Sequence, residues 1–267
     1  MQASPDFRLA RVFDLRLAQN MNTSSFTFCG ISFQALGSGA LWWPDAEMLV
    51  VSDLHLGKSD RIARRGGALL PPYETLETLQ KLARDIAATA PKTVISLGDS
   101  FDDDRGVNAL EAQERAMIEE LTAAHNWIWI SGNHDPAPKG LGGASADEVV
   151  KDTVAFRHIA SDNTSTLGEI SGHFHPKLRL QTRAGMISRA VFIWDAKRLI
   201  LPAYGAYTGG LDVTHEQIMG RLDPLTAQAI LTGLTPICVP AYPAAKTAQH
   251  RHSPASQRLP HRRGNSG

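Results

Sequence analysis

Cysteine is scarce in this chain, which has only Cys29 and Cys238 among its 267 residues. Two cysteines this far apart do not form the dense disulfide framework of small secreted domains, and we expect both to be reduced thiols of the core. The chain also lacks an apolar run long enough to span a membrane, and it lacks the charged and then apolar layout of a secretory signal. The sequence therefore predicts a cytoplasmic protein that does not associate with membranes.

An excess of charge of either sign is absent too, because 27 Lys and Arg residues balance 27 Asp and Glu residues. Bulk charge therefore does not attract nucleic acid, and any such contact must come from local basic patches and metal ions. Histidine, by contrast, is plentiful, with ten residues in the chain. Five of them lie in short polar motifs, namely His55, His134, His158, His173 and His175.

The order of predicted elements indicates an α/β fold. Buried strands are predicted at 48–51, 93–97 and 127–130, and the intervening helices at about 71–86 and 109–123. A strand over 26–36, with a turn at 37–39, precedes them. Further short strands follow near 154–157, 169–171, 178–181, 190–194 and 198–201. Strand–helix–strand units followed by a β-rich half predict two mixed sheets packed together, with helices outside.

The two ends of the chain differ in composition from the middle. Residues 1–22 show no clean periodicity, and Met1 and Met21 are both candidate starts. Residues 244–267 are rich in His, Arg, Pro, Ser and Gln and poor in apolar residues. We expect a disordered leader over 1–22, one domain over 23–243 and a disordered basic tail over 244–267.

Five polar motifs occur in order along the chain, and four of them follow a predicted strand. They are Asp53-Leu54-His55, Gly98-Asp99-Ser100-Phe101-Asp102, Gly132-Asn133-His134-Asp135, His158, and Gly172-His173-Phe174-His175-Pro176. Strand residues two apart point the same way, so the side chains of Asp53 and His55, or of His173 and His175, can share one ion. Taken alone, the first three motifs are also common in turns, and a lone histidine is usually a packed or surface residue. Together they favour a metal site.

The number of ligands fits two metal ions. One set is Asp53, His55, Asp99 and His175, and the other is Asp99, Asn133, His158 and His173. Mixed nitrogen and oxygen ligands suit Mn²⁺, Fe or Zn²⁺, and they argue against a site for Mg²⁺ alone or for Ca²⁺. The absence of cysteine from both sets disfavours a structural zinc site.

The motif order D-x-H, G-D-x-x-D, G-N-H-D, H and G-H-x-H resembles that of the calcineurin-like metallophosphoesterase superfamily, over roughly Asp53 to His175. The resemblance implies a four-layer fold of two mixed sheets flanked by helices. It also implies hydrolysis of phosphate esters at two divalent ions that share Asp99 and a water. We expect hydroxide from this water to attack the phosphate in line. His134 would protonate or stabilise the leaving oxygen, and Asp102 would orient the His134 ring.

A narrower resemblance extends over about Phe26 to Pro240. The strings DLHLGK, RRGGALLPPYET, ISLGDSFDD, WIWISGNHDP, GEISGHFHP and LPAYGAYTGGLDV look like those of the bacterial ligase-associated DNA damage response endonucleases of the PdeM type. This resemblance implies a Mn²⁺-preferring phosphodiesterase or nuclease that acts on DNA in repair. It also implies a functional association with an ATP-dependent DNA ligase and a helicase.

Substrate-binding residues are less well marked in the sequence. Arg64 and Arg65 would grip phosphates, or they would lie in a solvated loop, and Tyr207 would stack on a base. Trp127 and Trp129 alternate with isoleucines and are predicted to be core residues. The main alternative function is that of a small-molecule phosphohydrolase, acting on a nucleotide-sugar pyrophosphate or a cyclic nucleotide. A non-catalytic scaffold is disfavoured because every expected ligand is present.

Overall fold

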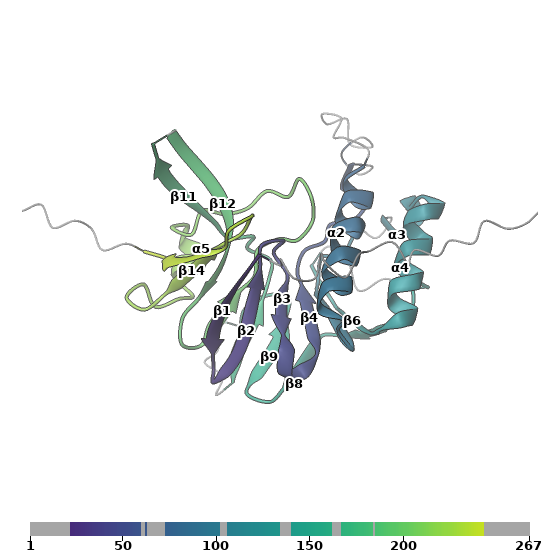
Figure 1. Ribbon diagram of the computed structural model, residues 1–267, viewed down its shortest axis with the longest axis horizontal. Helices are drawn as coiled ribbons and strands as arrows, with labels where there is room; N and C mark the ends of the chain where they lie inside the picture. Colours follow the sequence, from purple (N-terminus) through teal and green to yellow (C-terminus); the bar gives the residue numbers. More distant parts are fainter. Residues whose placement is uncertain are drawn as a thin grey trace, which may run out of the picture.

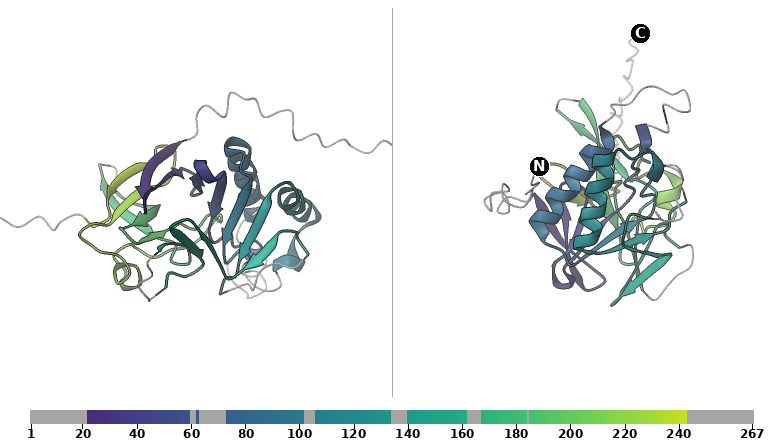
Figure 2. Two further views of the ribbon diagram at one scale, coloured as in Figure 1. Left: turned by 90° about the horizontal axis from the view of Figure 1, so that it is seen from below. Right: turned by 90° about the vertical axis from the view of Figure 1, so that its right-hand side faces the viewer.

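The computed structural model describes residues 22–59, 62, 73–101, 106–133, 140–161, 167–183 and 185–242. Two mixed β-sheets pack face to face, and helices cover the outer face of one of them (Figures 1 and 2). The predicted α/β class with two mixed sheets is confirmed. The predicted leader, apart from Asn22, and the predicted tail lie outside the described residues, so their disorder stays a prediction.

The first sheet has seven strands in the order of the chain. They are β1 (Thr23–Phe28), β2 (Ile31–Leu36), β3 (Leu41–Trp43), β4 (Met48–Val51), β5 (Thr93–Leu97), β6 (Asn126–Ile130) and β7 (Ala144–Ala146). The strands from β1 to β4 pair antiparallel, and those from β4 to β7 pair parallel. The turn η3 (Pro44–Ala46) joins β3 to β4. The parallel half of this sheet brings the ends of β4, β5 and β6 to one edge.

The second sheet has the order β15-β14-β12-β13-β10-β9-β8, and β11 pairs with β12 alone. Its strands are β8 (Glu148–Lys151), β9 (Val154–Arg157), β10 (Gly168–Ser171), β11 (Lys177–Thr182), β12 (Gly185–Trp194), β13 (Arg198–Ile200), β14 (Gln228–Leu231) and β15 (Ile237–Pro240). The three neighbours β9, β10 and β13 are parallel. β11 and the first half of β12 form a hairpin that projects from the body (Figure 1).

Two helices, α2 (Glu74–Thr89) and α4 (Ala112–Ala124), cover the outer face of the first sheet. The predicted helix over 109–123 is interrupted, because α3 (Gly106–Ala109) ends before Glu111. Glu111 begins α4 with a capping box, in which its side chain and that of Glu114 each accept from the other's backbone N–H. The second sheet is covered by the one-turn helix α5 (Glu216–Met219) and loops. Among the described residues, no helix is both long and apolar enough to cross a membrane.

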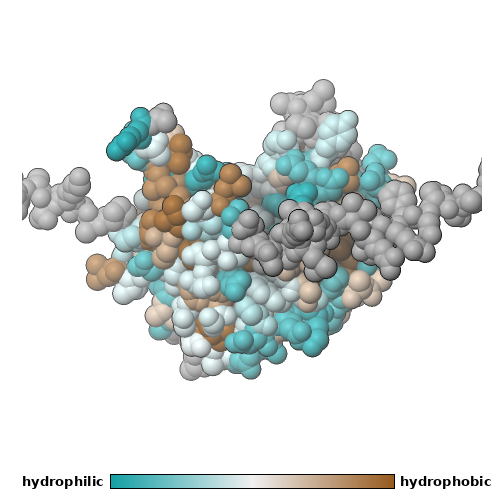
Figure 3. All heavy atoms as spheres, in the orientation of Figure 1, coloured by the Kyte–Doolittle hydropathy of each residue, from teal (hydrophilic) through white to brown (hydrophobic). Residues whose placement is uncertain are grey.

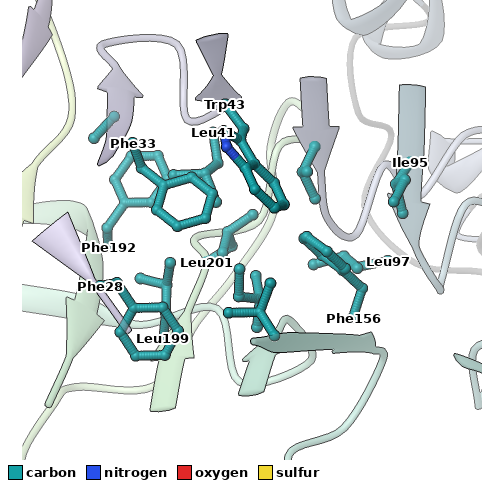
Figure 4. Close-up of a cluster of buried hydrophobic side chains, with 14 of the residues drawn as sticks. Phe28, Phe33, Leu41, Trp43, Ile95, Leu97, Phe156, Phe192, Leu199 and Leu201 are labelled. Atoms are coloured by element: carbon teal, nitrogen blue, oxygen red, sulfur yellow. The ribbon is translucent and has the colours of Figure 1, made fainter. Parts of the chain in front are cut away.

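Large apolar side chains fill the space between the two sheets (Figure 4). Phe33 and Trp43 from the first sheet meet Phe156 and Phe192 from the second. Side chains alternate along each strand, so the opposite faces of the first-sheet strands pack under α2 and α4. Trp127 and Trp129 lie there, 2% and 1% exposed, as core residues and not as a surface for stacking bases.

Two expectations from the sequence are wrong in detail. The segment 26–36 is not one strand, because β1 and β2 form a hairpin around Cys29 and Gly30. Both residues have positive φ, 49° and 80°, which suits a tight turn between antiparallel strands. The cysteines are not core residues either, since Cys29 is only partly buried in this turn and Cys238 is exposed on β15.

Candidate metal centre

The polar motifs of the first sheet meet at the carboxyl ends of its parallel strands. Asp53 and His55 follow β4, Asp99 follows β5 and Asn133 follows β6. The backbone N–H of His55 donates to the carbonyl of Asp99 over 3.0 Å, which ties the first two segments together. Loops at this edge of a parallel sheet commonly carry functional groups, because the strands all end there.

The second sheet contributes its histidines from neighbouring parallel strands. His158 follows β9, and His173 and His175 follow β10. The N–H of Gly172 donates to the carbonyl of His158 over 3.0 Å, and the N–H of His173 donates to Oδ2 of Asp53 over 2.9 Å. The structure therefore brings all seven predicted ligand residues to one place between the sheets.

Asp53, His55 and His175 form the first group, in which one ligand atom from each lies within 4.8 Å of the others. Nε2 of His175 lies 3.2 Å from Oδ1 of Asp53 and 3.3 Å from Nε2 of His55. The other carboxylate oxygen of Asp53, Oδ2, accepts from the hydroxyl of Ser52 and from the backbone of His173. These two donors fix the carboxylate and leave Oδ1 facing the imidazoles.

Asp99, His158 and His173 form the second group by the same measure. Nε2 of His158 lies 3.4 Å from Oδ2 of Asp99 and 3.2 Å from Nδ1 of His173. Oδ1 of Asn133 lies 2.8 Å from Nε2 of His158, so ligand atoms from four residues converge. The two groups adjoin, since Oδ1 of Asp53 is 4.0 Å from Nδ1 of His158. The bridging role of Asp99 stays a prediction.

The ring of His158 shows why this site suits a cation. Its Nδ1 donates to the carbonyl oxygen of Leu97 over 2.8 Å, so in the neutral ring Nε2 carries a lone pair. That lone pair faces the amide oxygen of Asn133 and the carboxylate of Asp99, which are also acceptors. Acceptors this close repel one another unless a proton or a metal ion lies between them.

The groups around His158 favour the protonated form of its ring. Burial lowers the pKa of His158, but the hydrogen bond with Asp99 and the charges of Asp53 and Asp99 outweigh burial and raise the pKa. The pKa of Asp53 is lower than its usual value. Burial alone would raise this pKa, but the hydrogen bond with His175 and the charges of His175 and the other imidazoles outweigh burial. Burial and the charge of His158 lower the pKa of His173. An ionised Asp53 and a neutral His173 are the forms that bind metal.

The spacing of the ligand atoms fits shared ions as well. Neighbouring ligand atoms lie 2.8–3.4 Å apart within the two groups. Nitrogen and oxygen ligands lie about 2.0–2.2 Å from ions such as Zn²⁺, so two ligands of one ion are roughly 3–3.5 Å apart. The donor set and its spacing therefore fit a pair of transition-metal ions.

Backbone strain is concentrated at the same residues. Ten described residues other than glycine have positive φ, and five of these are candidate ligands, namely Asp53, His55, Asp99, His173 and His175. Each such conformation costs about 1–3 kcal/mol and persists only where the surrounding structure imposes it. The fold thus holds these side chains in position at a cost to stability, as functional sites often do.

Some supporting groups have no clear signal in the sequence. Ser52 directly precedes Asp53, so its place at the strand end was visible, but its contact with the carboxylate was not. Leu97 acts through its backbone carbonyl, which no side-chain pattern reveals. Gly172, by contrast, is part of the fifth motif, and it is required where the sheets meet, because an added Cβ would lie 1.7 Å from Oγ of Ser52 and 2.5 Å from Oδ2 of Asp53.

Four other predicted site residues cannot be placed. His134, Asp102, Arg64 and Arg65 lie outside the described residues, and their roles stay predictions. Tyr207 is described, and it lines a cavity of about 290 Å³ that borders His175. Its side chain is 53% exposed and its φ is 54°.

Comparison with known proteins identifies the family to which the chain that carries this site is similar. A model described as Calcineurin-like phosphoesterase matches residues 47–198. The Pseudomonas putida nuclease MPE has a similar structure, with a TM-score of 0.62, 24% identity and coverage of 81% of this chain and 100% of that chain. Yfce, a phosphoesterase from E. coli, aligns with a TM-score of 0.39 and 13% identity over 73% of this chain and 98% of that chain. Among curated proteins, none matches this chain.

The residues matched by the family model include all seven candidate ligands and make up more than half of the chain. The same residues form the two adjoining groups of nitrogen and oxygen ligands between the sheets. The chain belongs to the calcineurin-like phosphoesterase family and is a hydrolase of phosphoester bonds.

Proposed function

We propose that this protein is a phosphodiesterase that cleaves nucleic acid and depends on two divalent metal ions. One observation carries the proposal, which is the convergence of two adjoining ligand groups, Asp53–His55–His175 and Asp99–Asn133–His158–His173, in one place. A single structural ion would need only one such group.

The side chains of the site would bind and position the metal ions. The imidazoles and carboxylates hold the ions, and the hydrogen bonds from Ser52 to Asp53 and from His158 to Leu97 fix which ligand atoms face inward. When bound, the two ions would supply Lewis acidity that offsets the charge on phosphate and makes water more acidic at neutral pH. No side chain has to act as the nucleophile.

His134 is the proposed general acid, and Asp102 the residue that orients its ring. His134 directly follows the candidate ligand Asn133 in the sequence, and this adjacency supports the role. If His134 protonates the leaving oxygen, His134→Ala should keep metal but lose at least ~100-fold in turnover. Full activity of this variant with metal retained would remove His134 from the role.

Mn²⁺ is the proposed native metal, with Zn²⁺ or Fe as alternatives. The ligand atoms are imidazole nitrogens, carboxylate oxygens and one amide oxygen, and no sulfur is among them. Such a set is suited to these ions more than to Ca²⁺, which prefers oxygen ligands only.

DNA is the proposed substrate, and DNA repair the proposed setting. The similar structure of the nuclease MPE supports a nucleic-acid substrate, and the motif strings support a ligase-associated role. An association with an ATP-dependent DNA ligase and a helicase rests on that resemblance in sequence. The alternative is a small-molecule phosphohydrolase, and the 290 Å³ cavity beside His175 is large enough for a small substrate.

One set of assays tests the proposal. Purified protein is supplied with Mn²⁺, Zn²⁺ or Mg²⁺ and offered an aryl phosphodiester, an aryl phosphomonoester, single-stranded DNA or duplex DNA. We expect Mn²⁺-dependent cleavage of the aryl diester and of DNA. Activity confined to the monoester, or equal activity without added metal in the presence of a chelator, would overturn it.

A further inference from the structure

The loop that follows β13 is bound to the segment that carries Asp53. The backbone N–H of Tyr204 donates to the carbonyl of Ser52 over 2.7 Å. The N–H of Gly205 donates to the carbonyl of Asp53 over 3.0 Å. The two segments lie so close that a Cβ on Gly205 would be 2.2 Å from the carbonyl oxygen of Leu54. Tyr204 and Gly205 therefore hold the backbone of residues 52–54 in place.

The conformation of Asp53 makes this support necessary. Its φ is 52°, in the left-handed region that residues other than glycine adopt only where the surrounding structure imposes it. Its carboxylate is fully buried among the imidazoles of the first ligand group. The hydrogen bond from Gly205 acts on the carbonyl of Asp53 itself, so it bears directly on the conformation that aims the carboxylate at a metal ion.

Tyr204 is fixed in turn to α2. Its side chain is fully buried, and its hydroxyl donates to Oδ2 of Asp85 over 2.7 Å. Nζ of Lys81 donates to the carbonyl of Tyr204 over 2.6 Å and lies 3.8 Å from the centre of its ring. The hydroxyl oxygen of Thr78 accepts from the N–H of Ala206 over 3.0 Å. Positions 78, 81 and 85 share one face of a helix, so this face of α2 holds the loop.

The bond between Tyr204 and Asp85 is the link in this chain of contacts that a substitution can remove most cleanly. Burial and the charge of Asp85 raise the pKa of Tyr204 well above its usual value, so the hydroxyl keeps its proton and stays a donor. Asp85 also lines a cavity of about 820 Å³, whose other walls include residues of the β11–β12 hairpin. Figure 3 shows the hairpin and α2 on either side of this hollow. Shortening Asp85 therefore enlarges an existing cavity and opens no new void in the apolar core.

We propose that Tyr204 and Asp85 are positioning residues of the metal centre, which hold the backbone of Asp53 in place from α2. The proposal rests on the proposed pair of metal ions, and it goes beyond the ligands to the helix that supports one of them. It assigns this support to the group of Asp53, His55 and His175, because the hydrogen bonds of the loop reach the backbone of Asp53.

Binding of Mn²⁺ to metal-depleted protein tests the proposal without relying on catalysis. The full chain and its variants are depleted with a chelator, freed of it, and titrated with Mn²⁺ in competition with a chromogenic chelator. Tyr204→Phe removes one oxygen atom and keeps the ring. We expect the affinity of one ion to fall by about 10-fold, as for other groups that orient a metal ligand, and the affinity of the other ion to stay near its wild-type value.

Variants of Asp85 separate positioning from a general effect on the fold. Asp85→Ala removes the acceptor of the Tyr204 hydroxyl and should weaken the same ion by a similar factor. Asp85→Asn keeps an oxygen that can accept this hydrogen bond, so it should recover most of the lost affinity. If the bond served stability alone, these variants would unfold at lower temperature while both ions bound as in the wild type.

Tyr242→Phe is the matched control. Its hydroxyl donates to the backbone carbonyl of Val213 over 3.1 Å, and neither residue is a candidate ligand. This variant should bind both ions like the wild type. Wild-type affinities in Tyr204→Phe and Asp85→Ala, an equal loss at both ions, or an equal loss in Tyr242→Phe would overturn the proposal and leave the metal centre standing. A wild type that takes up no Mn²⁺ would overturn the metal centre, and this proposal with it.

Discussion

Gly98 makes room for the imidazole of His158. A Cβ at residue 98 would lie 2.5 Å from Nδ1 and 2.6 Å from Cγ of that ring. The φ of Gly98 is +74°, a conformation that side chains other than glycine rarely adopt. The glycine before Asp99 therefore places a histidine from the other sheet among the ligands.

Gly98→Ala should displace His158 and weaken metal binding. We expect at least about a 10-fold loss of affinity for the second ion, because supporting groups of a metal site typically contribute 10- to 100-fold. Backbone strain adds roughly 1–3 kcal/mol of destabilisation. Metal titration and thermal unfolding measure the two effects. Gly140→Ala is the control, since Gly140 has a similar φ of +78° but nothing within 4 Å of an added Cβ. Normal metal affinity in Gly98→Ala would refute the steric argument.

Ser52→Ala should weaken the binding of the ion held by Asp53, His55 and His175. The Ser52 hydroxyl donates to Oδ2 of Asp53, and its loss frees the carboxylate to rotate away from His175. Affinity for metal should fall by about 10-fold, as measured by competition with a chromogenic chelator. Ser96→Ala removes another buried serine hydroxyl, one that bonds to Ser100 and not to a ligand side chain, and it should leave the affinity alone. Equal affinities for the two variants would contradict this role.

Stability should rise with pH in the alkaline range because of Lys81. Its Nζ donates to the carbonyl of Tyr204 over 2.6 Å, and burial lowers its pKa to about 8. In the unfolded chain the pKa returns to 10.5, so between pH 8 and 10 the folded state binds fewer protons. The free energy of unfolding should therefore increase with pH over this window, by up to about 1.4 kcal/mol per pH unit.

Urea titrations from pH 7 to 10 measure this slope for the wild type and for Lys81→Met. The variant should lose the rise, whatever its stability at neutral pH, because it has no ammonium group to titrate. A slope that persists in Lys81→Met would assign the effect to another group.

Removal of metal should lower stability. Ions that bind only the folded state stabilise it by about 2.7 kcal/mol at a free concentration 100 times the dissociation constant. Dialysis against a chelator should therefore lower the unfolding temperature by several degrees, and Mn²⁺ should restore it where Ca²⁺ does not. An unfolding temperature that changes neither on dialysis against the chelator nor on addition of Mn²⁺ would argue against a metal bound by the folded chain.

The sequence predicts that the candidate ligands lie near one another because each follows a predicted strand, and the structure brings them together from the ends of strands in both sheets. Asp53, Asp99 and Asn133 were placed by the buried strands before them, and these strands are recognisable from apolar runs alone. The turn at Cys29 was missed because the apolar pattern continues across it from β1 into β2. The strands β14 and β15 are short and weakly marked, and a pairing partner in the second sheet defines them.

Contacts between distant segments could not be predicted. Lys81 and Tyr204 are 123 residues apart in the sequence, but Lys81 donates a hydrogen bond to the carbonyl of Tyr204. The backbone N–H groups of Tyr204 and of the next residue, Gly205, donate in turn to the carbonyls of Ser52 and Asp53. Only the packing of α2 against this loop reveals the link. The cavity of about 820 Å³ has the same origin, because residues of the hairpin and of α2 line it together.

Counting the metal ions tests the central claim most directly. Protein loaded with Mn²⁺ and freed of excess ion is analysed for metal content, for the wild type, Asp53→Asn and His173→Ala. We predict two ions per chain in the wild type and about one in each variant, since each change affects one ligand group. A wild-type protein with no more than one ion, or variants that retain two, would contradict the account.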